Sequence, residues 1–283
     1  GPEIIKRMTD TYRRFRNTLR YLLGALDGYD AADKLAYDDM PDLEKWVLHR
    51  IATLDQQIRE MTENYDFHGI FTELHQFCNS DLSAFYFEIR KDMLYCDLPD
   101  STGRRACRMV MHELFNRLTA WLAPIICFTA EEAWQSYVGD PQNSVHLRSY
   151  DATPEIWHNA DIEAKWTTIR QVRQVVMSAL EKARNDGAIG ASLQAAPLVY
   201  VTADMQTAFA GQDAASLFIT SAATITTDTP TVDAFRLDTV ADVAVGFAAA
   251  TGDKCARCWK VMPEVSGPDG ICKRCTDVVA TLA

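Results

Sequence analysis

Four cysteines near the end of the chain restrict its possible folds more strongly than any other feature of the sequence. Cys255, Cys258, Cys272 and Cys275 form two C-x2-C pairs with 13 residues between them. Each pair can form a tight knuckle that presents two thiolates, and two knuckles complete a tetrahedron of sulfur ligands. Zinc prefers this ligand set and geometry. The spacing therefore predicts one structural Zn²⁺ with four protein ligands and no open coordination position.

The residues around these cysteines, 251–283, contain too little apolar material to form a hydrophobic core by themselves. We therefore expect metal binding, worth on the order of 10–16 kcal/mol in small zinc modules, to provide the folding energy of this segment. The alternatives for the same cysteines are two disulfides, four free thiols without a function, or iron in a rubredoxin-like electron carrier. The first residues show no secretory signal, so we expect a reducing, cytoplasmic location, which favours a metal over disulfides.

Apolar residues in the first half of the chain recur at steps of three and four, which is typical of helices with one buried face. Asp66 is the predicted N-cap of one such helix, in which a break is expected near residues 79–80. Thr129 and Glu132 form a predicted capping box at the start of another. Residues 3–137 are therefore expected to form an all-helical bundle. The predicted helices cover residues 4–26, 41–61, 66–89, 102–122 and a short segment from 129.

The second half of the chain has a different pattern. Residues 138–160 contain a glycine and two prolines and are expected to form an irregular linker. A helix predicted over 161–185 is followed by short β-branched runs, so residues 161–250 are expected to form a small α+β domain. The acid-rich stretch 228–242 is interpreted as solvated surface. The predicted strands are 198–202, 217–220, 224–227 and 243–247. The fold class is thus mainly α, with a helical bundle, a small α+β connector domain and a four-cysteine zinc module over 251–283.

Charge is distributed unevenly along the sequence. The net charge of −11 argues against a polyanionic partner. Residues 1–24, however, carry six basic side chains against two acidic ones, whereas residues 187–253 carry seven aspartates and a single arginine. Basic residues are again frequent around the cysteines. Because nucleic acid binds to local positive charge rather than to the average, it should prefer the two ends of the chain.

The first predicted helix has two distinct faces. Its apolar stripe begins with Ile4, Ile5, Met8 and Tyr12, which we expect to be buried. Basic side chains and Asn17 align away from this stripe, and arginine is well suited to bind phosphate oxygens. A merely solvated helix face is the alternative interpretation of this basic stripe.

Trp259 follows a predicted zinc ligand and either packs on the knuckle or offers a ring on which an exposed base stacks. It completes the set of predicted contacts to nucleic acid. These contacts are Arg13, Arg16, Asn17 and Arg20 on the first helix, and Arg257, Trp259, Lys260 and Arg274 beside the cysteines.

No catalytic constellation is evident in the sequence. It lacks a nucleophile elbow, an H-E-x-x-H motif, a Walker A loop and a dinucleotide fingerprint, and its six histidines do not cluster with carboxylates. No apolar run approaches the roughly 20 residues that a membrane-spanning helix needs. A helical protein-interaction module with a structural zinc clip and no affinity for RNA, which the negative net charge favours, is the rival interpretation.

Several segments resemble the isoleucyl-tRNA synthetases of bacterial type, which are class I enzymes. Residues 15–23 are similar to their "RNTxRFLL" helix, residues 189–195 to "IGSSLEA", and residues 254–259 to the zinc motif "KCxRCW". The similarity covers essentially the whole chain. Gln194 departs from the family pattern, which has an acidic residue at this position. Further landmarks lie at residues 65–68, 85–96 and 122–134.

The resemblance implies that residues 3–137 are the anticodon-binding domain and that the partner is the anticodon stem-loop of tRNA(Ile). The "HIGH" and "KMSKS" motifs that bind ATP in this family are absent from the sequence. The catalytic and editing domains are therefore expected upstream on the same polypeptide. This chain would hold tRNA for an isoleucine–tRNA ligase, be inactive in aminoacylation by itself, and exist as a cytoplasmic monomer.

Overall fold

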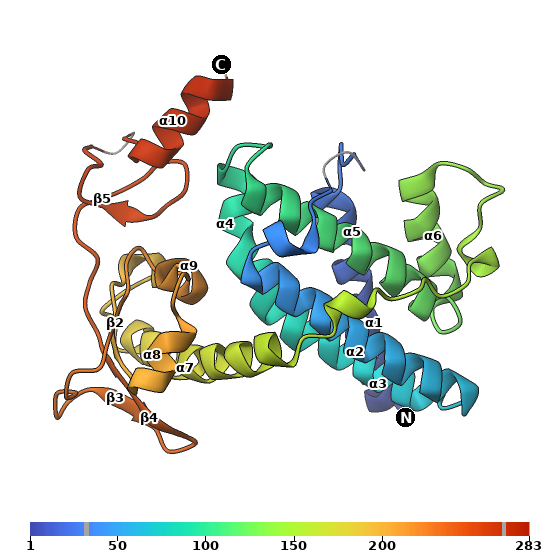
Figure 1. Cartoon of the computed structure of the whole chain (residues 1–283), viewed down its shortest axis with the longest axis horizontal. Helices are drawn as coiled ribbons and strands as arrows, with labels where there is room; N and C mark the ends of the chain where they lie inside the picture. Colours follow the sequence, from blue (N-terminus) through green and yellow to red (C-terminus); the bar gives the residue numbers. More distant parts are fainter. Residues whose placement is uncertain (31–33, 268–269, 283) are drawn as a thin grey trace. The chain divides into compact units, whose positions relative to one another are not determined.

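The computed structural model describes residues 1–30, 34–267 and 270–282. The chain divides into two compact units: unit 1 comprises Gly1–Leu94 and Pro99–Ile162, and unit 2 comprises Tyr95–Leu98 and Glu163–Ala283. Most described residues are helical, and the described strands form a four-stranded and a two-stranded sheet (Figure 1). Residues 268, 269 and 283 of the predicted zinc module lie outside the described residues. No helix in the described part of the chain is both long and apolar enough to cross a membrane.

Unit 1 contains helices in all five regions where the apolar periodicity predicts them. Trp46, Phe115 and Trp121 are among its largest fully buried side chains. As predicted, Asp66 caps a helix, because its Oδ1 accepts a hydrogen bond of 2.8 Å from the amide of Gly69. The helices are α1 (Pro2–Ala25), α2 (Asp42–Glu63), α3 (Phe67–Gln76), η3 (Phe77–Phe87), α4 (Glu88–Cys96), α5 (Thr102–Leu122) and α6 (Cys127–Val138), and a 3-10 turn η2 (Tyr37–Asp39) precedes α2.

The predicted break near residues 79–80 is wrong. The chain remains helical from α3 through η3 to α4, and η3 is an 11-residue π-helix. In a π-helix each amide bonds to the carbonyl five residues earlier, so the turn widens instead of ending. Buried side chains accordingly recur every four residues in η3. They form the two rows Phe77, Asp81, Phe85 and Cys78, Leu82, Tyr86.

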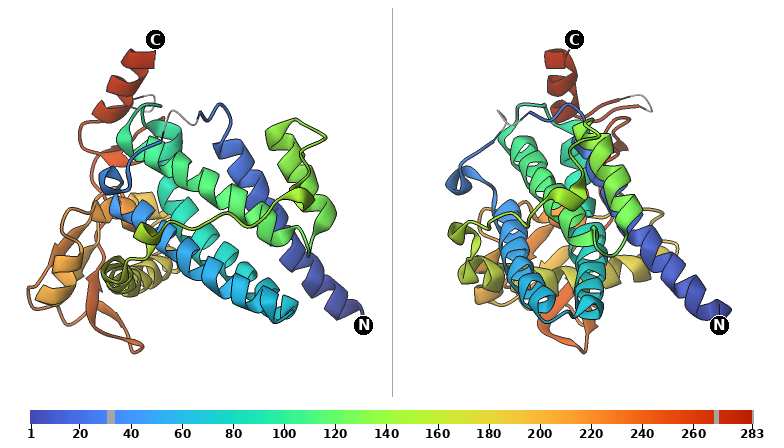
Figure 2. Two further views of the ribbon diagram at one scale, coloured as in Figure 1. Left: turned by 45° about the vertical axis from the view of Figure 1, so that its right-hand side comes forward. Right: turned by 90° about the vertical axis from the view of Figure 1, so that its right-hand side faces the viewer.

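The start of α1 also differs from the prediction. Phe15 and Leu22 are fully buried, but Ile4, Ile5 and Met8 are 64%, 70% and 51% exposed. Figure 2 shows that the first turns of α1 extend beyond the other helices of unit 1. Periodicity identifies the apolar face of a helix, but it cannot tell along how much of its length a neighbour covers that face.

The predicted capping box of α6 is wrong as well. The helix begins two residues earlier, at Cys127, and its N-cap Ile126 makes no side-chain capping bond. Thr129 instead lies inside the helix, with its Oγ1 2.9 Å from the hydroxyl of Tyr12 on α1. The residue pattern of a capping box is present, but both of its side chains are used for contacts to another helix.

Residues 138–160 are irregular, as predicted, yet they are held firmly on unit 1. Arg117 donates from Nη1 to the carbonyl of Asp151 and from Nη2 to that of Ala152, at 3.1 Å each. Trp157 is buried. The segment contains two 3-10 turns, η4 (Val145–Leu147) and η5 (Glu155–Trp157).

The long helix α7 (Ala160–Asn185), most of which belongs to unit 2, is followed by a small mixed sheet with the strand order β2-β1-β4-β3. Strand β1 pairs with β2 in parallel and with β4 in antiparallel. A 3-10 turn, η6 (Ser192–Gln194), precedes the sheet. The strands are β1 (Leu198–Tyr200), β2 (Thr224–Thr226), β3 (Phe235–Leu237) and β4 (Val240–Gly246), and the short helices are α8 (Ala203–Ala208) and α9 (Ala214–Phe218).

Two strand predictions in this region need correction. Residues 217–220 do not form a strand, because Asp213 caps α9 by accepting from the amide of Ser216 at 3.2 Å. Strand β3 was not predicted, since it lies in the acid-rich stretch 228–242 that was interpreted as surface. It pairs with β4 through Phe235 and Val245.

Candidate metal centre and nucleic-acid interface

The four cysteines of the predicted zinc site lie together at the end of unit 2. The first pair lies between two short antiparallel strands, β5 (Asp253–Lys254) and β6 (Val261–Met262), and the second lies at the start of α10 (Lys273–Leu282). All four are buried, and their sulfur atoms lie within 4.8 Å of one another. The Sγ atoms of Cys258 and Cys272 are 3.7 Å apart. Zn–S bonds of about 2.3 Å in a tetrahedron separate the sulfurs by about 3.8 Å, so the arrangement fits such an ion.

The electrostatics of the four thiols also favour a bound cation. Burial by itself would raise the pKa of Cys255, but backbone amides of Cys258, Cys272 and Arg257 donate to its sulfur and lower the pKa to about 6. Burial raises the pKa of Cys258 and of Cys272, and backbone hydrogen bonds offset only part of this rise. Because several thiolates cannot share a buried site without a compensating charge, this donor set suits a soft or borderline divalent metal ion.

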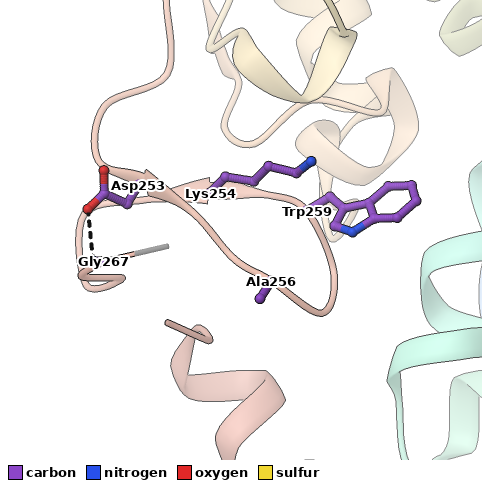
Figure 3. Close-up of a pocket in the computed structure, with 5 residues that line it drawn as sticks. All are labelled: Asp253, Lys254, Ala256, Trp259 and Gly267. Carbon is purple, nitrogen blue, oxygen red and sulfur yellow. Dashed lines mark hydrogen bonds between the residues drawn. The ribbon is translucent and has the colours of Figure 1, made fainter. Parts of the chain in front are cut away.

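Trp259 is an exposed aromatic side chain directly beside a cysteine of the first pair. It is 60% exposed, and its φ of 67° lies in the left-handed region that bulky residues rarely adopt. The ammonium group of Lys254 lies 5.1 Å from the centre of its ring. Figure 3 shows both side chains at a cavity of about 470 Å³, whose loops are joined by a 3.2 Å bond from the Gly267 amide to Asp253. The lining residues are Asp253, Lys254, Ala256, Trp259 and Gly267.

The other predicted contacts near the cysteines are less exposed. Lys260 is half-buried, and its carbonyl accepts from the amide of Cys255. Arg257 donates to the carbonyl of Cys96 at 2.7 Å and Arg274 to the carboxylate of Asp97 at 3.3 Å. Both arginines are therefore already engaged by groups of unit 2.

The predicted contacts on α1 all lie in unit 1 and are exposed. Arg16 is 47% exposed in its side chain and forms a two-pronged ion pair with Glu132 of α6, at 2.7 and 3.2 Å. Hydrogen bonding to Arg16, then its charge, lowers the pKa of Glu132. Arg13 lies 3.4 Å from Asp10 on the same helix. Asn17 and Arg20 lie on the exposed side of α1.

Two residues beside these sets are not among the predicted contacts. Lys254 is one of the basic residues that surround the cysteines in the sequence, but its position beside the ring of Trp259 is visible only in the structure. Glu132 was assigned to a cap, and no local signal connects it with Arg16, 116 residues earlier in the chain.

Comparison with known protein families shows which class of protein this chain belongs to. Residues 44–200, more than half of the chain, match the family described as the anticodon-binding domain of tRNA ligases, and the chain belongs to that family. Within this class of protein, the relatives of this chain are ligases for one amino acid, isoleucine. The isoleucine–tRNA ligase of Ruegeria pomeroyi is 47% identical over 279 residues, which cover 97% of this chain and 29% of the relative.

Two further isoleucine–tRNA ligases, from Agrobacterium fabrum and Caulobacter vibrioides, are 47% and 44% identical over 94% of this chain and 27% of their own length. The resemblance to isoleucyl-tRNA synthetases is thereby confirmed. The chain spans less than a third of the length of these relatives.

Proposed function

We propose that this chain is the C-terminal, tRNA-binding part of a class I isoleucine–tRNA ligase and that it holds the anticodon arm of tRNA(Ile). The observation that carries the proposal is the family match over residues 44–200, together with relatives of one specificity along nearly the whole chain. The catalytic and editing domains would lie upstream on the same polypeptide, and the chain alone would not charge tRNA. We further propose that the protein is a cytoplasmic monomer.

We propose two contact regions for the RNA. On α1, the exposed side chains Arg13, Arg16, Asn17 and Arg20 would bind phosphates or the anticodon loop, since guanidinium groups match phosphate oxygens in two-pronged bonds. Beside the cysteines, Trp259 would stack on a base and Lys260 would approach phosphate. Arg257 and Arg274, which are engaged within unit 2, would contribute through their charge.

The four cysteines would hold one structural Zn²⁺. When bound, the ion cross-links the two knuckles and supplies the folding energy that the module cannot obtain from apolar burial. The chain's own residues then fix the loop on which Trp259 is displayed. Metal analysis should find one zinc per chain and a colourless protein, whereas a coloured protein would indicate iron.

Binding to tRNA tests this proposal. The chain should bind tRNA(Ile) more tightly than an unrelated tRNA in a gel shift, and each phosphate contact should add roughly −0.7 to −0.9 to the slope of log affinity against log salt. Arg20→Ala should weaken binding about tenfold, as expected for one charged hydrogen bond, without a change in Tm beyond a few degrees.

Arg236→Ala serves as the matched control, because it removes an exposed arginine from the acid-rich segment. A salt slope near zero, or equal binding of both tRNAs, would favour the protein-interaction module instead. If Arg20→Ala lowered the Tm as strongly as it weakened tRNA binding, the role of Arg20 would be structural.

A further inference from the structure

The two cysteine knuckles share a detail of sequence that RNA binding does not explain. In each knuckle an arginine directly precedes the second cysteine: Arg257 comes before Cys258, and Arg274 comes before Cys275. Both arginines reach the same short segment, Tyr95–Leu98. Each half of the predicted metal site thus extends one guanidinium group to one stretch of chain that lies more than 150 residues earlier.

The segment is the end of helix α4. The last carbonyl groups of a helix have no amide partners within it, and a positive charge near them is favourable. Arg257 supplies hydrogen-bond donors and a positive charge at this helix end. Its Nη1 donates to the carbonyl of Cys96 at 2.7 Å, and its Nη2 donates to the carbonyl of Tyr95 at 3.4 Å. Arg274 lies 3.3 Å from the carboxylate of Asp97, the next residue. Arg257 therefore acts as a C-terminal cap for a helix far away in sequence.

The position of this cap depends on the cysteines. Arg257 lies between the two ligands of the first knuckle, and its Nη1 is also 3.6 Å from the sulfur of Cys275 in the second. The side chain of Cys96 is 6% exposed and is buried in the same cluster as the four cysteines and Val265. Residues 95–98 accordingly belong to unit 2, although the chain before and after them belongs to unit 1.

We propose that metal binding at the four cysteines clamps Tyr95–Leu98 through Arg257 and Arg274 and thereby fixes the end of α4. Arg257 is a positioning residue in this clamp: it connects the ligand loop to two helix carbonyls. Arg274 adds a side-chain ion pair from the other knuckle. Loss of the metal would release both arginines, and the last turn of α4 would fray.

Hydrogen–deuterium exchange of the whole chain, loaded with one equivalent of Zn²⁺, tests the clamp. In Arg257→Gln, amides of residues 95–98 should exchange about tenfold faster than in the parent, because two charged bonds to carbonyls are lost. Arg274→Gln should give a smaller increase. Amides in the middle of α5 should keep the parent rate. Lys273→Gln is the matched control, since it removes an exposed charge beside the same ligands and should leave residues 95–98 unchanged.

Two further measurements keep the test decisive if Arg257→Gln does not retain zinc. Asp97→Asn removes the partner of Arg274 without changing the cysteine module, and it should raise exchange at residues 95–98 with one zinc still bound. Chelation of the parent chain should raise exchange in the same residues. If these residues exchange at the parent rate in Asp97→Asn and in the chelated parent, the clamp is wrong. The readout involves no RNA, so it is independent of the proposed function.

Discussion

The helical unit 1 and the cysteine module of unit 2 differ in what is buried. In unit 1, Trp46, Phe115 and Trp121 are at most 1% exposed and belong to an extensive apolar core. Among the described residues of 251–282, only Val265 and Val278 are buried besides the four cysteines. Burial of a large apolar side chain stabilises by about 1.5–3 kcal/mol, so unit 1 distributes its stability over many residues. We expect the module to draw its stability mainly from one bound ion.

Loss of the metal should have the largest effect and should unfold the cysteine module while leaving unit 1 folded. Cys275→Ser removes one of four ligands, and metal binding is worth on the order of 10–16 kcal/mol in such modules. We expect residues 251–282 to become sensitive to protease while unit 1 keeps its helical circular dichroism. Cys127→Ser, at an exposed cysteine outside the module, should change neither. A Cys275→Ser module that resists protease as well as the parent would refute metal-dependent folding.

A substitution in the apolar core of unit 1 should destabilise unit 1 and leave the cysteine module intact. Trp121→Ala leaves a cavity in a tightly packed core and should lower the free energy of unfolding by about 3–5 kcal/mol, measured with urea. The zinc content should remain one per chain. Phe128→Ala, at a side chain that is 93% exposed, is the control and should change stability by less than about 0.5 kcal/mol. Loss of zinc in Trp121→Ala would mean that the module depends on the bundle core.

The smallest effect concerns strain within the module. A non-glycine residue in the left-handed region costs about 1–2 kcal/mol, and glycine avoids this cost. Trp259→Gly should therefore bind zinc about fivefold more tightly than Trp259→Ala in competition with a chelator. Both variants should bind tRNA(Ile) more weakly than the parent. Equal zinc affinity in the two variants would show that the φ of 67° at Trp259 carries no measurable strain.

Local signals in the sequence predicted much of this structure. Helix α5 has the predicted bounds because Ser101 caps its start, accepting from the amide of Arg104 at 3.4 Å, and Pro124 follows its end. The gathering of the four cysteines follows from their spacing alone. In both cases the information lies within a few residues of the feature that it determines.

The features that the sequence did not predict correctly depend on competing signals or on residues far apart in the chain. The β-branched run at 217–220 is overruled by the cap at Asp213, which is a stronger local signal than strand propensity. The pairing of Glu132 with Arg16, and the reach of Arg257 to Cys96, join residues more than 100 positions apart. Periodicity and motif spacing carry no information on such pairs, so only the folded chain reveals them.

The π-helical segment has a consequence for how chains of this kind can vary in length. A wide turn accommodates residues that a regular α-helix would not, so loss of a single residue from η3 could be absorbed by a return to α-helical winding. If η3 instead kept its π-helical winding, everything beyond the deletion would rotate by one residue's turn, roughly 100° in a helix. Arg90, which lies three residues past η3 and holds the buried Glu44 at 2.7 Å, would be turned away from its partner. Insertions and deletions in this helix should therefore be accepted where the winding of η3 compensates for them, or together with a change at Glu44.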